Sequence, residues 1–180
     1  ALFERVLAWA RERGAADLYG PIDFTTFGAY RVLLNPRPDR APFVGEPYDP
    51  AGTAERLEAL GFALARGYLS QEGSAEVVRQ LGEAYRPTLE ALEARGYRFE
   101  SLGPALWMER LREVHGMIDA VFGANFAYSP LTWPAFERAC GAGFIGRHHP
   151  GVSVVAWGPA GDLAGFSLVQ PDYGPLVRQA

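Results

Sequence analysis

The sequence contains no lysine, one cysteine and only two asparagines, Asn35 and Asn125. All 17 basic residues are therefore arginine, so neither a lysine Schiff base nor a lysine general base is available. The single cysteine, Cys140, excludes an internal disulfide. Sparse cysteine is typical of a reducing compartment, which predicts a cytoplasmic protein.

Long apolar runs and an excess of positive charge are also absent. No run approaches the roughly 20 residues that a membrane span needs, and residues 1–14 alternate charged and apolar groups, unlike a secretory signal. The net charge of −4 is evenly spread: residues 1–72 carry 8 Arg against 10 acids, and residues 73–180 carry 9 against 11. An even negative charge argues against nucleic acid or a membrane surface as the partner.

Apolar residues spaced three and four apart predict the helices of this chain. These helices are expected over residues 2–13, 50–60, 75–95, 105–122 and 133–139. Three of these helices are preceded by a residue suited to cap them: Asp49 before the second, Ser74 before the third and Thr132 before the fifth. Pro87 is expected to kink or restart the third.

Strand patterns cover residues 16–24, 62–70 and 97–102, and two more in 152–174 are joined by a tight turn. A two-stranded hairpin is marginal in water, so another strand must complete the last pair. Alternating helices and strands with one late hairpin predict an α/β fold in which helices flank a mixed central sheet.

Two stretches of the sequence interrupt this order. Residues 35–50, "NPRPDRAPFVGEPYDP", hold five prolines and predict a loop. Residues 71–74, "QEGS", predict a linker, and the boundary near residue 73 divides the chain into segments 1–72 and 73–180.

The segment "AERLEALGFALARGYLS" resembles the late helix and strand of the GNAT superfamily of acetyl-CoA-dependent N-acetyltransferases, and "ERGAADLYGPIDFTTFGAYRVLL" resembles the region after the cofactor loop of that fold. "YRFESL", helix 105–122, "NFAYSPLTWPAFE" and the final hairpin resemble its first strand, two helices, and second and third strands. "FGANFAYSPLT" with "VVAWGPAGDLAGFSLVQPD" looks like the front half of a bacterial subgroup.

This resemblance implies a tandem-type protein of which the chain is the middle part. Residues 1–72 would be the C-terminal half of one GNAT-like unit and residues 73–180 the N-terminal half of another. The two halves could also pair within one chain as a permuted domain. The activity implied is transfer of an acetyl group from acetyl-CoA to the amine of a small molecule or peptide.

The cofactor loop of the superfamily is not recognisable in this sequence. The family pattern, Arg/Gln-x-x-Gly-x-Gly/Ala before a helix, cradles the pyrophosphate with backbone N–H groups. "CGAGFIGRHHPG" (140–151) is rich in glycine but precedes a strand, and it is expected to be a flexible loop. The cofactor strand is therefore expected from flanking segments or from a partner, which predicts a homo-oligomer.

The catalytic residues stay unassigned. The tyrosine that protonates the departing thiolate in many GNAT enzymes would fall at Leu57, which cannot donate a proton. An alternative is a catalytically silent GNAT-like module that serves oligomerisation or ligand sensing. A third is an unrelated α/β domain that shares only the order of elements.

By the same resemblance, the loop between the two helices would line the acceptor pocket. Its candidate residues are Asn125, Phe126, Tyr128 and Trp133, which alternatively pack the loop against the sheet. Asp23, at the end of a predicted strand, is a further candidate for the pocket, or a turn-forming aspartate that bonds local N–H groups.

The histidines and the cysteine do not predict a metal centre or a nucleophile. Adjacent His148 and His149 point to opposite sides of an extended chain and cannot easily hold one ion. His115 borders the apolar stripe of its helix and is expected to be a hydrogen-bonded flank. Cys140 has no base nearby in sequence and is expected to be a small buried residue.

Overall fold

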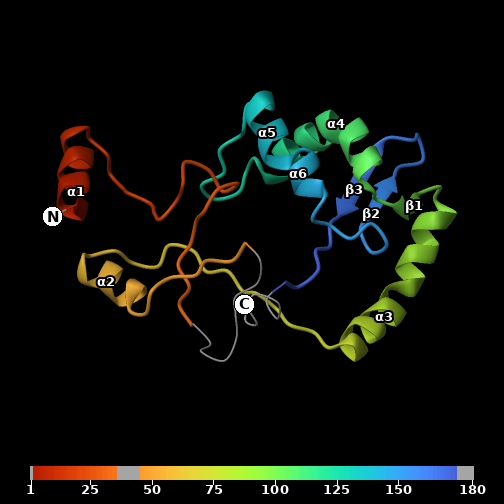
Figure 1. Cartoon of the computed structure of the whole chain (residues 1–180), viewed down its shortest axis with the longest axis horizontal. Helices are drawn as coiled ribbons and strands as arrows, with labels where there is room; N and C mark the ends of the chain where they lie inside the picture. Colours follow the sequence, from red (N-terminus) through yellow and green to blue (C-terminus); the bar gives the residue numbers. More distant parts are fainter. Residues whose placement is uncertain (1, 36–44, 174–180) are drawn as a thin grey trace. The chain divides into compact units, whose positions relative to one another are not determined.

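The computed structural model describes residues 2–35 and 45–173, so residues 36–44 of the predicted proline-rich loop lie outside the described residues. The helices and strands in this part of the chain are labelled in Figure 1. In chain order they are α1 (Leu2–Glu12), α2 (Thr53–Ala59), α3 (Ala75–Ala94), β1 (Arg98–Ser101), α4 (Pro104–Phe122), α5 (Trp133–Cys140), α6 (Ala142–Ile145), β2 (Val154–Trp157) and β3 (Leu163–Ser167).

The contacts within the chain divide it into two compact units. Among the described residues, unit 1 comprises residues up to Tyr68, residues 126–129 and residues 172–173. Unit 2 comprises residues 69–125 and 130–171. The loop between α4 and α5 thus contributes four residues to unit 1, although the helices on either side of it belong to unit 2.

Unit 2 is built on a three-stranded sheet in the order β1-β2-β3. β1 completes the hairpin of β2 and β3, as expected, with Arg98 opposite Trp157 and Val154 opposite Ser167. Both pairings are antiparallel, so the prediction of α/β structure is confirmed but a mixed sheet is not found in the described residues. A single crossover helix returns a chain parallel to its first strand, whereas here α4 and α5 together bring β2 back in the opposite direction.

The turn of the hairpin requires a glycine. Gly158 N donates to Asp162 O at 2.8 Å and Gly161 N donates to Gly158 O at 2.9 Å, which closes the turn. Gly161 has φ 81°, a left-handed conformation that glycine adopts without steric cost.

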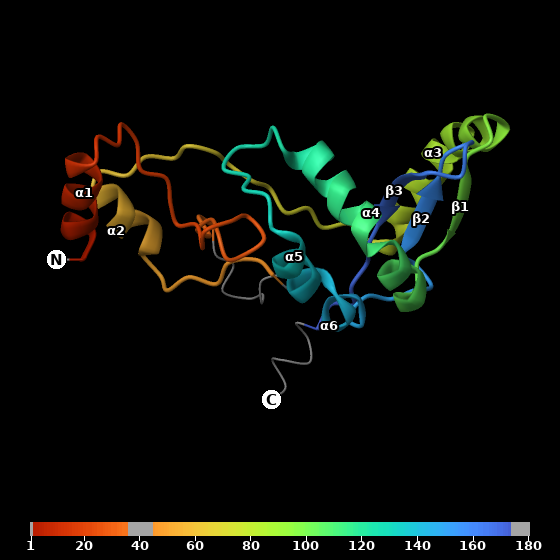
Figure 2. The same cartoon turned by 90° about the horizontal axis from the view of Figure 1, so that it is seen from above.

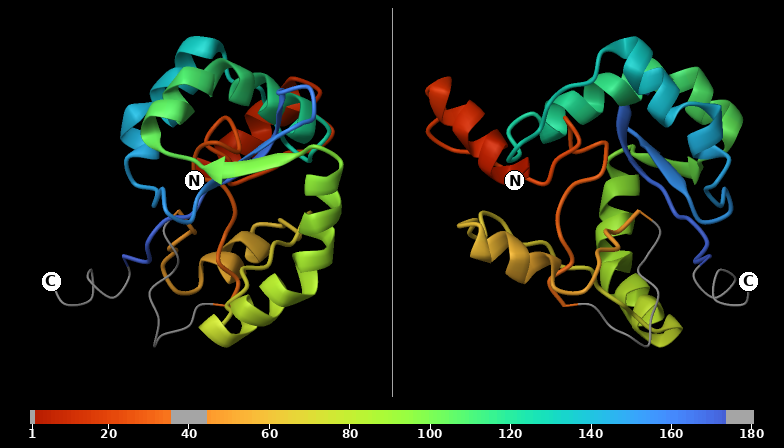
Figure 3. Two further views of the ribbon diagram at one scale, coloured as in Figure 1. Left: turned by 90° about the vertical axis from the view of Figure 1, so that its right-hand side faces the viewer. Right: turned by 60° about the vertical axis from the view of Figure 1, so that its left-hand side comes forward.

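The core of unit 2 forms where α4 packs on the sheet and on the following helices. Trp107, Leu111 and Val114, spaced four and three apart, are the buried residues of α4. In Figures 2 and 3, α4 lies against the sheet, and α5 and α6 lie beside α4. The indole N–H of Trp107 donates to the carbonyl of Cys140 at 2.7 Å, which joins α4 to the end of α5.

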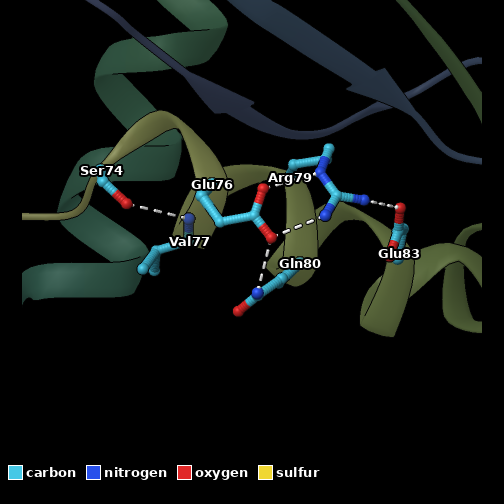
Figure 4. A network of polar contacts seen from close by, with 6 residues as sticks. All are labelled: Ser74, Glu76, Val77, Arg79, Gln80 and Glu83. Atoms are coloured by element: carbon cyan, nitrogen blue, oxygen red, sulfur yellow. Dashed lines mark hydrogen bonds and ion pairs between the residues drawn. The ribbon is translucent and has the colours of Figure 1, made fainter.

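Helix α3 runs without interruption through Pro87, so the expected restart does not occur. It begins where predicted: the Oγ of Ser74 accepts a hydrogen bond from the N–H of Val77 at 3.3 Å (Figure 4). Thr132 is likewise the N-cap residue of α5, but its side chain makes no capping hydrogen bond. Across the described ranges, we find no helix that combines the length and the apolar character needed to cross a lipid bilayer.

Unit 1 has less regular structure than the sequence predicts. The expected strand at 16–24 is reduced to one antiparallel bridge between Ile22 and Tyr30, and the expected strand at 62–70 has no regular structure. Asp49 does not cap α2, because its Oδ2 accepts from the N–H of Leu33 at 2.8 Å. The two strand predictions were wrong for a shared reason: apolar and β-branched residues form strands only where neighbouring strands pair with them.

Two valines of α4 allow a matched test of this core. Val114 is 2% exposed and Val121 is 62% exposed. We expect Val114→Ala to lower the free energy of unfolding by roughly 1–3 kcal/mol, because it removes buried methyl groups and leaves a cavity. Val121→Ala should change it by no more than about 0.5 kcal/mol. Urea titration followed by circular dichroism measures both, and equal losses would contradict the assigned core.

Candidate functional site

The five predicted site residues fall into both units. Asp23, Phe126 and Tyr128 belong to unit 1, whereas Asn125 and Trp133 belong to unit 2. The predicted set therefore contributes to two clusters, each of which is described by itself.

In unit 1, residues 19–30 fold back on themselves. Asp23 N donates to Ala29 O at 2.8 Å, and Thr25 N donates to Asp23 O at 2.7 Å. The hydroxyl of Thr25 donates to the carbonyl of Ser129 at 3.1 Å, which fastens this turn to the 126–129 segment. At the tip, Phe24 is 94% exposed and has φ 58°, an uncommon conformation for a residue with a side chain.

Aromatic pairs extend the contact between the two loops of unit 1. The rings of Tyr19 and Phe126 meet edge to face with centroids 5.0 Å apart, and those of Phe27 and Tyr128 are 6.0 Å apart. The guanidinium of Arg66 lies 5.2 Å from the ring of Phe126. Phe126 and Tyr128 are thus packed against neighbouring side chains, which favours the packing role over the pocket wall.

Asp23 does not bond local N–H groups through its side chain, and its role in a pocket stays a prediction. Its backbone makes the local turn bonds, but its side chain makes no hydrogen bond or ion pair with any described residue. The residue is exposed, so its carboxylate faces solvent at the rim of the turn. A turn-forming aspartate would use that carboxylate to accept local N–H groups.

In unit 2, His115 of α4 joins the start of α5. Its Nε2 lies 2.8 Å from the carbonyl of Leu131 and 3.6 Å from the Oδ2 of Asp119. A carbonyl only accepts, so Nε2 carries the proton in this hydrogen bond. The imidazole also stacks on Phe136, with centroids 4.6 Å apart, and lies 5.9 Å from Trp133. The prediction of a hydrogen-bonded flank is confirmed.

Arg112 completes this group, which we name the α4–α5 cluster: Arg112, His115, Trp133 and Phe136. The guanidinium of Arg112 lies over the indole of Trp133, 4.1 Å from the ring centroid. Among the described residues it has no carboxylate partner, since Arg110 forms ion pairs with both Glu109 and Glu113. Its N–H donors are therefore available to a ligand. The sequence analysis missed Arg112, although its spacing of three from His115 puts both on one side of α4.

Asn125 lies in the turn that follows α4. Its backbone N–H donates to Phe122 O at 2.8 Å, and the residue is exposed. The structure therefore places it on the surface of unit 2, with no hydrogen bond from its side chain to another described residue.

The glycine-rich segment 140–151 does not form a phosphate cradle. Residues Ala142–Ile145 form α6, a short helix where the sequence predicted a flexible loop. The backbone N–H groups of residues 144–149 all donate within unit 2, for example His149 N to Val169 O at 2.8 Å. A pyrophosphate needs several N–H groups that point outward together, so these residues do not fit acetyl-CoA.

The adjacent histidines have separate partners. His148, 8% exposed, donates from Nδ1 to the carbonyl of Phe144 at 3.0 Å, and its Nε2 accepts from the amide of Gln170 at 3.1 Å. The Nδ1 of His149 accepts from the N–H of Gly151 at 3.2 Å. Within residues 2–35 and 45–173 no group of three or more His, Cys, Asp and Glu side chains is placed to hold a metal ion.

Comparisons of this chain with protein-family models, with curated proteins and with solved structures found no match.

Cys140 is a buried free thiol. Burial raises the pKa of Cys140 from 9.0 to about 11, which lowers the thiolate fraction near pH 8 by about 100-fold. Because the thiolate is the nucleophile, this environment argues against a catalytic cysteine.

We expect Cys140 to react at least about 100-fold more slowly with a disulfide reagent in the folded protein at pH 8 than in guanidinium chloride. The absorbance of the released thiolate measures the rate, and the single cysteine makes the signal unambiguous. Equal rates in the two conditions would mean that Cys140 is accessible in the native state.

Proposed function

We propose that this chain is part of a GNAT-type N-acetyltransferase that transfers an acetyl group from acetyl-CoA to an amine of a small molecule or peptide. The observation that carries the proposal is the order of elements in unit 2. A first strand, two helices and an antiparallel hairpin follow one another as β1, α4, α5, β2 and β3, with the short α6 between α5 and β2. This is the order that the resemblance of the local sequence implies.

The α4–α5 cluster supplies the acceptor side in this proposal. The α4–α5 loop leads directly into Trp133, and Arg112 presents a cation beside it. His115 has a positioning role: its hydrogen bond to Leu131 holds the start of α5, and thereby the indole, next to α4. A guanidinium with free N–H donors suits the polar or anionic groups of an amine substrate.

Acetyl-CoA has no assigned residues in this chain. The backbone N–H groups of residues 144–149 donate to acceptors within unit 2 and are not available to its phosphates. A cytoplasmic location is part of the proposal and rests on the single, unpaired cysteine.

A second candidate function is a catalytically silent GNAT-like module for oligomerisation or ligand sensing. Two observations favour it: the backbone N–H groups of residues 144–149 offer no phosphate cradle, and the apolar residues Val78, Leu81, Tyr85 and Leu89 of α3 are exposed. The two candidates differ in whether the protein binds acetyl-CoA.

Calorimetric titration of the full-length protein with acetyl-CoA separates the two candidates. We expect saturable binding at one site per chain, and no such binding of 3′-phosphoadenosine 5′-diphosphate, which lacks the pantetheine arm, at the same concentrations. Absence of acetyl-CoA binding would contradict the acetyltransferase proposal and favour the silent module.

A matched pair of variants tests the acceptor side. Arg13, in the turn that follows α1 in unit 1, lies over Trp9 at 4.2 Å, nearly the geometry of Arg112 over Trp133 at 4.1 Å. We expect Arg112→Gln to raise the KM for the amine by about 10-fold, because it removes a charged hydrogen-bond donor. Arg13→Gln should leave KM unchanged. Steady-state kinetics measures both, and equal effects would show that Arg112 has no special role.

A further inference from the structure

Two partners fix where the buried imidazole of His148 carries its proton. The residue is 8% exposed and follows α6 in the chain. Its Nδ1 lies 3.0 Å from the carbonyl oxygen of Phe144, and its Nε2 lies 3.1 Å from the amide nitrogen of Gln170. Because a carbonyl only accepts, Nδ1 carries a proton. In the neutral imidazole Nε2 is therefore the acceptor, and the NH2 group of Gln170 faces it.

The amide of Gln170 has an unused acceptor. Its Oε1 is buried and has no hydrogen-bond partner among the described residues. Rotation of the amide by half a turn would exchange its oxygen and its nitrogen within the same space, and the terminal torsion of glutamine allows both orientations. While His148 is neutral, that rotation would set Oε1 against the lone pair of Nε2. Neutral His148 therefore holds Gln170 in the orientation that leaves Oε1 unpaired.

A proton on His148 reverses this preference. The imidazolium donates from both ring nitrogens, so the NH2 group of Gln170 then faces a second donor. The rotated amide instead presents Oε1, which accepts from Nε2–H. The ring of Phe144 also attracts the positive charge, since its centroid lies 4.6 Å from that of the imidazole. The charge of one side chain thus sets the orientation of the other.

The charged groups around His148 leave Oε1 of Gln170 as the acceptor for this added proton. The guanidinium of Arg147 lies 5.8 Å from the ring of Phe144, and Nδ1 of His149 accepts from its own loop. Residues 150–153 and 168–171 carry no charge. Helices α4 and α5 also pack on α6, and none of their charged side chains forms an ion pair or a hydrogen bond with His148. These side chains are Glu109, Arg110, Arg112, Glu113, His115 and Asp119 of α4 and Glu137 and Arg138 of α5.

We propose that His148 and Gln170 form a proton-operated switch, in which uptake of a proton from solvent at Nε2 of His148 rotates the amide of Gln170 by half a turn. Backbone bonds beside the pair hold its two segments together: His149 N donates to Val169 O at 2.8 Å, and Val169 N donates to the Oγ of Ser153 at 3.0 Å. Gln170 is also one residue from the end of unit 2 at Pro171. The switch therefore makes a contact at the end of unit 2 sensitive to pH, and it does not depend on the proposed acetyltransferase activity.

Nitrogen-15 NMR of the full-length protein from about pH 8 to about pH 5 tests the switch. We expect His148 to pass from a proton on Nδ1 alone to protons on both nitrogens, and the side-chain amide signals of Gln170 to shift with the same midpoint. The side-chain amide of Gln80, which donates to Glu76 on α3, is the matched control and should not follow that midpoint. A His148 that stays neutral over this range, or Gln170 signals that do not follow it, would overturn the proposal.

Two substitutions of Gln170 should move the midpoint of His148 in opposite directions. Gln170→Glu offers Nε2 only acceptors and a negative charge, so the midpoint should rise by at least about 1 pH unit. Gln170→Leu removes the acceptor for the added proton, so the midpoint should fall. Gln80→Glu adds the same charge on α3 and should leave it unchanged. Equal midpoints in the wild type and both Gln170 variants would show that the amide does not respond to the charge of His148.

Discussion

Unit 2 depends on one side chain, the indole of Trp107. It is 1% exposed, and it contacts the rings of Phe144 and Phe166 with centroids 5.8 and 5.4 Å away. Its N–H donates to the carbonyl of Cys140. One residue of α4 thereby fixes α5, α6 and β3, by ring contacts that exclude water and by a hydrogen bond that satisfies the buried end of α5.

The sequence was informative about unit 2 because its signals are local and agree with one another. Trp107, Leu111 and Val114 follow the helical period, and each is buried. The hairpin needed a third strand, and β1 supplies it. What could not be predicted was the strand direction, because it depends on how two consecutive helices reverse the chain, a property of packing rather than of any residue pattern.

Unit 1 was predicted less well, and the reason is again physical. A strand pattern such as residues 62–70 forms a strand only where a neighbouring strand pairs with it. In the described part of unit 1, the only strand-like pairing is the bridge between Ile22 and Tyr30. Asp49 shows the same limitation for a side chain. A residue with the right chemistry to cap α2 instead satisfies the distant N–H of Leu33. Asp49 and Leu33 are 16 residues apart in the sequence, so the pattern around Asp49 does not reveal its partner.

The candidate site was found only in part. Trp133 was named from the resemblance, and the structure adds what surrounds it, namely the stacked Arg112 and the His115 that holds the start of α5. Phe126 and Tyr128, named on the same ground, pack on the turn of unit 1 instead. Consecutive segments of one loop belong to different units, and a sequence motif does not show where one segment ends and the next begins.

The absence of lysine means that every basic side chain near the candidate site is an arginine. All 17 basic residues carry a planar guanidinium, which can bond to carboxylates, stack on an aromatic ring, or do both. Arg79 bonds to carboxylates, and Arg110 does so while it also lies over the ring of Trp157, so carboxylates use the N–H donors of both. Arg112 stacks on the indole of Trp133 without a carboxylate partner among the described residues, so its N–H donors stay free while the indole fixes its position. A stacked arginine is thus already oriented for a ligand, and this is why Arg112, rather than an ion-paired arginine, marks the candidate site.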